Sequence, residues 1–267
     1  PNDVWQAHVS YREFGHEYDP AVGFVTRNGF RRVEPRLAWR PLSDTSWIRR
    51  YSVSAQYRRL ANLTTGQVEE EQWDLNLFGF DFEAGGNWDI IAHRQDEFLD
   101  RAFEIRDEIV IQPGQYTNWE WTLTTRTPSQ RRLSANVNFT NGGFWSGDRF
   151  RYLLGLTFRP NPGISFSTDI ERNDVKLPEG NFIVDLTRFE AAWDINPWVS
   201  VSGNIQYDTQ SEIVGLFARA RWIMKPGNDL FLVYTNNRRN LGGSLFDRNF
   251  RTLSQGGSVK VNYTYRL

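Results

Sequence analysis

The sequence contains no cysteine, so it can form no disulfide and offers no thiolate to a metal ion. Histidine is almost as scarce, because only His8, His16 and His93 occur, which leaves little material for a His-based metal or catalytic centre. No run of about 20 apolar residues is present, which argues against a transmembrane helix. Charge of one sign does not dominate either: 31 Lys and Arg face 32 Asp and Glu, so we expect no nucleic-acid partner.

The start of the chain lacks the features of a targeting segment. Residues 1–20 show no basic stretch followed by an apolar one, and Pro1 has no Met before it. Either a targeting segment has been removed or the chain is a piece of something longer. Because the first residues already have the pattern of a strand, we expect the second.

Aromatic residues are abundant, at 15% of the chain, and the apolar residues recur with a period of two. Strict alternation gives a strand one apolar face and one polar face. Two of the segments, 73–82 and 182–195, change parity midway, which predicts a β-bulge in each. The predicted strands are fourteen: 5–12, 33–40, 51–58, 73–82, 88–94, 119–123, 133–139, 150–158, 164–170, 182–195, 199–207, 214–222, 230–235 and 259–267.

The connections between these segments alternate in length. Short turns with Pro, Gly, Asn and Asp are predicted at 40–44, 84–87, 127–130, 159–163, 196–197 and 225–229. Longer loops are predicted at 13–32, 59–71, 95–117, 140–149, 171–181 and 236–256, and the one exception to the alternation is the short connection near 208–212. In 95–117 we expect an extended arm with a turn, which either folds into a lumen or covers an outer rim. In 142–147 we expect a loop that exposes two aromatic rings.

Alternation alone fits a soluble β-protein as well as a membrane barrel. Three features favour the membrane: strands of about 9 to 11 residues, rings gathered at strand ends, and the alternating loop lengths. We therefore predict an all-β fold, an antiparallel transmembrane β-barrel of about fourteen strands, as a single domain over residues 1–267. Both termini would lie on the periplasmic side of a bacterial outer membrane. The apolar end of the last strand, at Leu267, resembles the signal that recruits the barrel assembly machinery.

Three stretches resemble an uncharacterised family of Gram-negative outer-membrane proteins: 14–28 with Pro20–Val25, 171–182 and 221–234. Members of that family carry an N-terminal soluble domain similar to carbohydrate-binding family nine, followed by a C-terminal β-barrel. The resemblance covers the whole chain, which corresponds only to the C-terminal part of the family. It implies an outer-membrane barrel that can include strands before residue 1. It supplies no active-site motif.

The polar face would line the lumen of such a barrel and is rich in arginine. Because fewer acids than arginines fall on it, we expect a mild preference for anions. The leading hypothesis is thus a pore for solutes or polymers. The alternative is a closed structural barrel, braced by Arg–carboxylate pairs, that anchors a periplasmic or surface domain or partner. The predicted lumen-lining residues are Arg12, Arg36, Arg58, Arg132, Arg151, Arg219, Arg221, Lys260, Arg266, Glu34, Glu120 and Asp169.

A third hypothesis is an outer-membrane hydrolase built on His93, which has Asp89, Asp96 and Glu97 nearby in the sequence. Catalysis needs a nucleophile, a base and an orienting group that meet in space, and spacing along one strand does not establish this. We therefore expect no enzyme, and we assign no catalytic, cofactor-binding or metal-binding residue.

Overall fold

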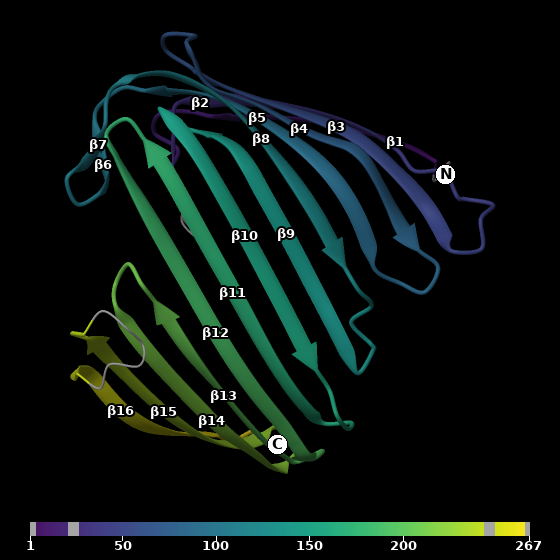
Figure 1. Cartoon of the computed structure of the whole chain (residues 1–267), viewed down its shortest axis with the longest axis vertical. Coiled ribbons are helices and arrows are strands. Elements are labelled where there is room, and N and C mark those ends of the chain that lie inside the picture. Colours follow the sequence, from purple (N-terminus) through teal and green to yellow (C-terminus); the bar gives the residue numbers. More distant parts are fainter. Residues whose placement is uncertain (1–3, 21–26, 243–248, 265–267) are drawn as a thin grey trace. The chain divides into compact units, whose positions relative to one another are not determined.

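The computed structural model describes residues 4–20, 27–242 and 249–264, and within them the chain is built from strands (Figure 1). Among these residues no helix is long and apolar enough to span a membrane. The strands are β1 (Trp5–Phe14), β2 (Phe30–Trp39), β3 (Ile48–Asn62), β4 (Val68–Phe82), β5 (Asn87–Leu99), β6 (Phe103–Arg106), β7 (Ile109–Ile111), β8 (Gly114–Arg126), β9 (Leu133–Phe144), β10 (Gly147–Phe158), β11 (Ile164–Leu177), β12 (Gly180–Asn196), β13 (Val199–Asp208), β14 (Ile213–Lys225), β15 (Asn228–Asn240) and β16 (Phe250–Asn262).

Fourteen of these strands form one sheet in sequence order, from β1 to β5, then β8 to β16, while β6 and β7 pair as a separate hairpin. Each pair of neighbours whose register is defined is antiparallel. The chain divides into two compact units. The first comprises residues 1–126, 138–151 and 174–182, and the second comprises 127–137, 152–173 and 183–267. The prediction of a single domain stays a prediction.

The fourteen predicted strands are confirmed, but most of them are longer than predicted. The backbone ladder continues through 59–62, 140–144 and 171–177, so the long loops predicted at 59–71, 140–149 and 171–181 are wrong. The last strand runs from Phe250 to Asn262, so it begins earlier than the predicted 259–267, of which 265–267 lie outside the described residues. The strands outlast the alternation of polarity, as β5 illustrates: the side chains of its apolar face change from Ile90 and Ala92 to Arg94 and Asp96. Alternation of polarity stops there, although hydrogen bonding between the strands does not.

Of the two predicted β-bulges, the first is confirmed. The register between β4 and β5 shifts between Asn76 and Phe78, which leaves Leu77 as the extra residue. In β12 the register with β13 is unbroken from Leu186 to Asp194 and shifts only at Ile195. A bulge is therefore present in this stretch, but at Ile195 near its end and not midway, where the parity changes. The alternation of apolar residues changes parity because each face of β12 changes polarity along the strand. Asp185, for example, lies on the same face as Phe189.

The main buried cluster lies in the first unit. Ile109 and Ile111 of β7 pack against Val175 and Leu177, and Ile111 has no exposed surface. Partly buried side chains complete the cluster: Leu99, Phe103, Ile105, Tyr116, Phe144, Trp145 and Phe182. The arm predicted in 95–117 is thus a hairpin with an apolar face that is covered. The exposed loop predicted at 142–147 is wrong, because Phe144 and Trp145 pack into this cluster at the turn between β9 and β10.

Candidate functional site

The register of the first unit places most of its predicted lumen residues on one face, here called the polar face. In Figure 1 the strands β1 to β5 and β8 lie side by side. Because side chains alternate along each strand, Arg12, Glu34 and Arg58 lie on this face, together with a row of residues that are paired from strand to strand. That row runs across the sheet through His8, Arg36, Gln56, Asp74, His93 and Glu120.

The opposite face of the same strands, here called the apolar face, is open to the surroundings. Leu37 is 51% exposed and Trp121 is 52% exposed, and both lie in the middle of it. Aromatic rings gather at the edge where β1 begins and β2 ends, with Trp5 and Trp39 only 6.3 Å apart between ring centroids. A continuous exposed apolar surface of this kind is uncommon on soluble monomers, and such surfaces mark contacts with protein partners, ligands or membranes.

The second unit repeats this division. Arg219 and Arg221 on β14 share a face with Ser202 and Ser200 of β13. Lys260 on β16 and Arg221 both lie opposite Phe231, so the polar face is interrupted there by a ring. Asp169 lies beside Gly155, where its carboxylate and the Asn136 amide occupy the space that a larger residue at position 155 would need. The other face carries Val201, Ala220, Leu232 and Val259.

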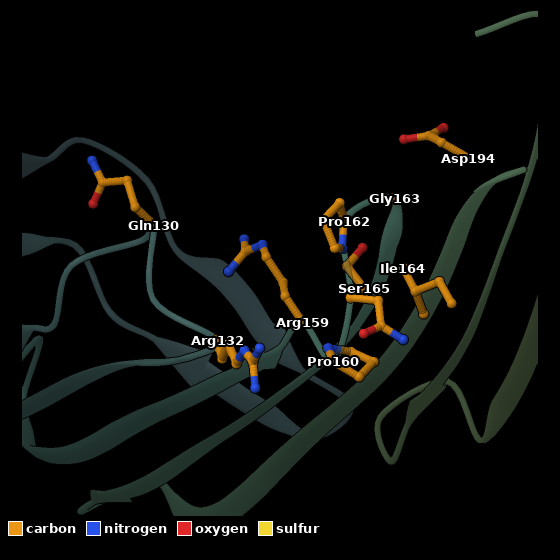
Figure 2. Close-up of a pocket in the computed structure, with 10 residues that line it drawn as sticks. Gln130, Arg132, Arg159, Pro160, Pro162, Gly163, Ile164, Ser165 and Asp194 are labelled. Carbon is orange, nitrogen blue, oxygen red and sulfur yellow. The ribbon is translucent and has the colours of Figure 1, made fainter. Parts of the chain in front are cut away.

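Three predicted lumen residues need separate comment. Arg132 is not in a strand but in the turn before β9, beside a hollow of about 440 Å³. Figure 2 shows Gln130, Arg132 and Arg159 on one side of this hollow and Asp194 on the other. Arg151 lies in β10, two residues after Arg149, and so shares its face. Arg266, like Leu267, lies outside the described residues.

Several arginines on the polar face of the first unit form ion pairs with carboxylates on other strands. Arg149 donates three hydrogen bonds to Glu120: Nη2 donates to Oε1 at 2.6 Å and to Oε2 at 2.8 Å, and Nε donates to Oε1 at 2.9 Å. Arg58 Nε donates to Glu34 Oε1 at 2.7 Å, and its Nη1 donates to Gln72 Oε1 at 2.8 Å. Such cross-strand pairs brace a sheet and use up the charge that would otherwise attract a solute.

The charges on the polar face of the first unit are sorted by strand. On β1 to β3 the arginines outnumber the carboxylates, on β4, β5 and β8 the carboxylates outnumber the arginines, and β10 adds Arg149 and Arg151. The expected mild preference for anions stays a prediction. Among the predicted arginines of this unit, Arg12 and Arg36 have no ion-pair partner within the described parts of the chain. The residues concerned are Arg12, Arg32, Arg36, Arg50 and Arg58 on the basic side, and Glu70, Asp74, Asp89, Glu97 and Glu120 on the acidic side.

His93 is oriented by Asp74, a residue that sequence spacing did not identify. The two side chains are 2.6 Å apart between Nδ1 and Oδ1, and they come from paired positions on β5 and β4. Asp96, one of its neighbours in sequence, points to the opposite face because the two residues have opposite parity. Within the described residues no hydroxyl group hydrogen-bonds the His93 ring, and no cluster of three or more His, Asp or Glu could hold a metal ion.

A cleft of about 250 Å³ opens on the polar face beside His93. Its walls come from β5, β8 and the β9–β10 turn, and they combine Gln95, Glu97 and Asn118 with the rings of Tyr116 and Trp145. The β6–β7 hairpin holds the rings, since Phe103 contacts Trp145 at 5.1 Å between ring centroids. Sequence reasoning missed this cleft, because the turn that carries Trp145 had been placed in an exposed loop.

The comparisons with known proteins add no family and no relative: no protein-family model matches the chain, and no curated protein matches it. The resemblance to a Gram-negative outer-membrane family therefore stays a prediction. What defines the protein at this point is an antiparallel sheet of fourteen strands with one polar and one exposed apolar face.

Proposed function

We propose that this chain forms a transmembrane β-barrel, or the larger part of one, in a bacterial outer membrane. The exposed apolar face carries this proposal, with side chains such as Val9, Leu37 and Trp121 open over the strands of the first unit. In lipid an apolar outer surface and aromatic rings at the interface are what a barrel needs. On β5 the polar residues Arg94 and Asp96 follow this band, as expected where a strand leaves the membrane.

A barrel in lipid leaves no strand edge unpaired, because unsatisfied backbone groups are costly there. The proposal therefore requires β1 and β16, the two ends of the sheet, to pair with each other or with further strands. It also places the edge with the turns at 83–86, 197–198 and 226–227 on the periplasmic side. The assembly machinery and outer-membrane lipid are the partners that this location implies.

The function we propose is passage of a solute or polymer through a lumen lined by the polar face. A preference for anions would come from polar-face cations such as Arg12 and Arg36, which have no ion-pair partner in the described residues. A closed scaffold that anchors another domain is the second candidate. It is favoured by the Arg149–Glu120 and Arg58–Glu34 pairs, which tie the wall together.

Single-channel conductance in a planar lipid bilayer distinguishes the two candidates. For the pore we expect a stable conductance with a reversal potential that leans towards anions under a salt gradient. The Arg36→Gln variant should move the reversal potential towards neutrality, because it removes a fixed positive charge from the proposed lumen.

Arg31→Gln is the matched control, since Arg31 lies on the same strand but on the opposite face. It should leave the reversal potential unchanged. Folded insertion without conductance would reject the pore and favour the scaffold. A chain that stays monomeric and folded in water without detergent would reject the membrane barrel altogether.

A further inference from the structure

The cleft beside His93 is built for a small ligand. At about 250 Å³ it lies just below the range of about 300–1,000 Å³ typical of sites for drug-sized molecules, which fits a ligand of one ring. It lies on the polar face of β5 and β8, so a solute that travels along this face would pass it. The residues around it differ from those on the rest of the wall, because three aromatic rings adjoin amide and carboxylate groups.

Of the charged groups that line the cleft, His93, Glu120 and Arg149 are paired before any ligand binds, while Glu97 is bound only by a neutral amide. Glu120 and Arg149 close on each other through three hydrogen bonds, and the Arg149 guanidinium also lies 4.5 Å from the centre of the Phe144 ring. Glu97 accepts a hydrogen bond from Gln95 Nε2 at 2.9 Å. A ligand that pairs with Arg149 or Glu120 would therefore have to compete with interactions that already exist. A neutral ligand would not.

Capacity for hydrogen bonds, in contrast, remains. The side-chain amide of Asn118 has no hydrogen-bond partner among the described residues, yet it lines the cleft and can both donate and accept. Glu97 offers further acceptor positions, because a carboxylate has about four and Gln95 uses one of them. A ligand with several hydroxyl groups matches this set, since each hydroxyl group also donates and accepts.

The rings supply the complementary apolar surface. Tyr116 and Trp145 line the cleft and contact each other edge to face, with 5.4 Å between their centroids. Both also pack against the buried cluster around Ile109 and Ile111, which fixes their positions before a ligand binds. Preorganised rings bind the apolar C–H face of a saccharide ring at little cost in entropy.

We propose that this cleft is a binding subsite for a neutral saccharide, one pyranose ring deep, with Asn118 and Glu97 binding hydroxyl groups and Tyr116 and Trp145 packing against the ring. The proposal rests on the proposed pore in one respect only: it names the class of solute that the pore would carry. Binding itself does not require conductance, so the two can be tested apart.

The test is calorimetric titration of the 267-residue chain, folded in detergent, with maltotriose, cellotriose and triacetylchitotriose. We expect saturable binding of at least one of them. Choline and glucuronate serve as cationic and anionic probes and should bind more weakly. Asn118→Ala should weaken saccharide binding roughly three- to tenfold, the loss expected for one or two hydrogen bonds. Trp145→Phe should alter both affinity and the change in tryptophan fluorescence on binding.

Gln56→Ala is the matched control: it removes an amide from the same polar face outside the cleft, on β3, and should leave affinity unchanged. Should Asn118→Ala fail to fold, the preference of the unmodified chain for neutral over charged probes still decides the question. The subsite is wrong if no saccharide binds, if choline or glucuronate binds more tightly, or if folded Asn118→Ala binds normally. Saccharide binding without conductance would overturn the pore alone, and conductance without saccharide binding would overturn the subsite alone.

Discussion

Arg149 and Glu120 are the most strongly joined residues on the wall of the first unit, and their side chains are only 23% and 14% exposed. At this depth the loss of one partner leaves the other half-buried and unpaired. We expect Arg149→Ala to reduce the free energy of unfolding by about 1–3 kcal/mol, measured by guanidinium titration of the chain in lipid vesicles.

The double variant that removes both residues should lose less than the sum of the two single variants, with a coupling energy of about 1 kcal/mol or more. Arg12→Ala is the control, because Arg12 lies on the same face without an ion-pair partner in the described residues; it should change stability by less than about 0.5 kcal/mol. Simple additivity in the cycle would show that the wall is not braced by this pair.

At the scale of the element, the β6–β7 hairpin is held by its apolar face. Ile111 is completely buried against Val175 and Leu177, so Ile111→Ala leaves a cavity that should cost about 2–4 kcal/mol. We expect the hairpin to detach before the sheet unfolds, because it pairs with no strand of that sheet. Hydrogen exchange of the amides between residues 103 and 111 should therefore accelerate, as should cleavage by trypsin after Arg106.

Val110→Ala provides the comparison within the same strand. Its side chain lies on the other face of β7 and is only partly buried, so exchange and cleavage should change little. Equal effects of the two substitutions would mean that the hairpin is not anchored through Ile111.

At the scale of the whole molecule, the effect of a charged residue on the apolar face depends on whether lipid or water surrounds that face. Leu37 lies in the middle of that face, and Ser54 lies close by on the polar face, on the neighbouring strand. In lipid, Leu37→Arg should destabilise the folded chain by about 2–4 kcal/mol, while Ser54→Arg should be nearly neutral. Unfolding titrations in vesicles measure both.

In water the same pair of substitutions would behave differently, since Leu37 is already half-exposed and an arginine there would be solvated. Nearly equal and small effects of Leu37→Arg and Ser54→Arg would therefore contradict the membrane barrel, whatever the conductance experiment gave. The comparison needs no knowledge of the solute.

Sequence reasoning found every strand of the sheet and missed where many of them end. Between residues 5 and 12 the alternation is complete, and β1 follows it to within two residues at its end. Between 171 and 177 the pattern fails, because β11 there buries Val175 and Leu177 on the face that is polar elsewhere. Alternation of polarity cannot predict where a strand ends when the surroundings of its two faces change along its length.

The candidate site was predictable in part. The parity of Arg36 and Glu120 follows from the period of two, and the register confirms that they share a face. The ion pairs on this face were not predictable. Arg58 hydrogen-bonds Glu34, which is 24 residues away in the sequence, and Arg149 hydrogen-bonds Glu120, which is 29 residues away. Such contacts depend on the register between strands, and a shift of one residue would move each side chain to the other face.

The sequence by itself thus determined the strands and their two faces, because the backbone of a strand sends successive side chains to opposite sides whatever lies around it. Only the tertiary structure decided which arginines are neutralised, how the hairpin is anchored and where the cleft forms. Those features join residues from different strands, and their free energy depends on distances that no single segment contains.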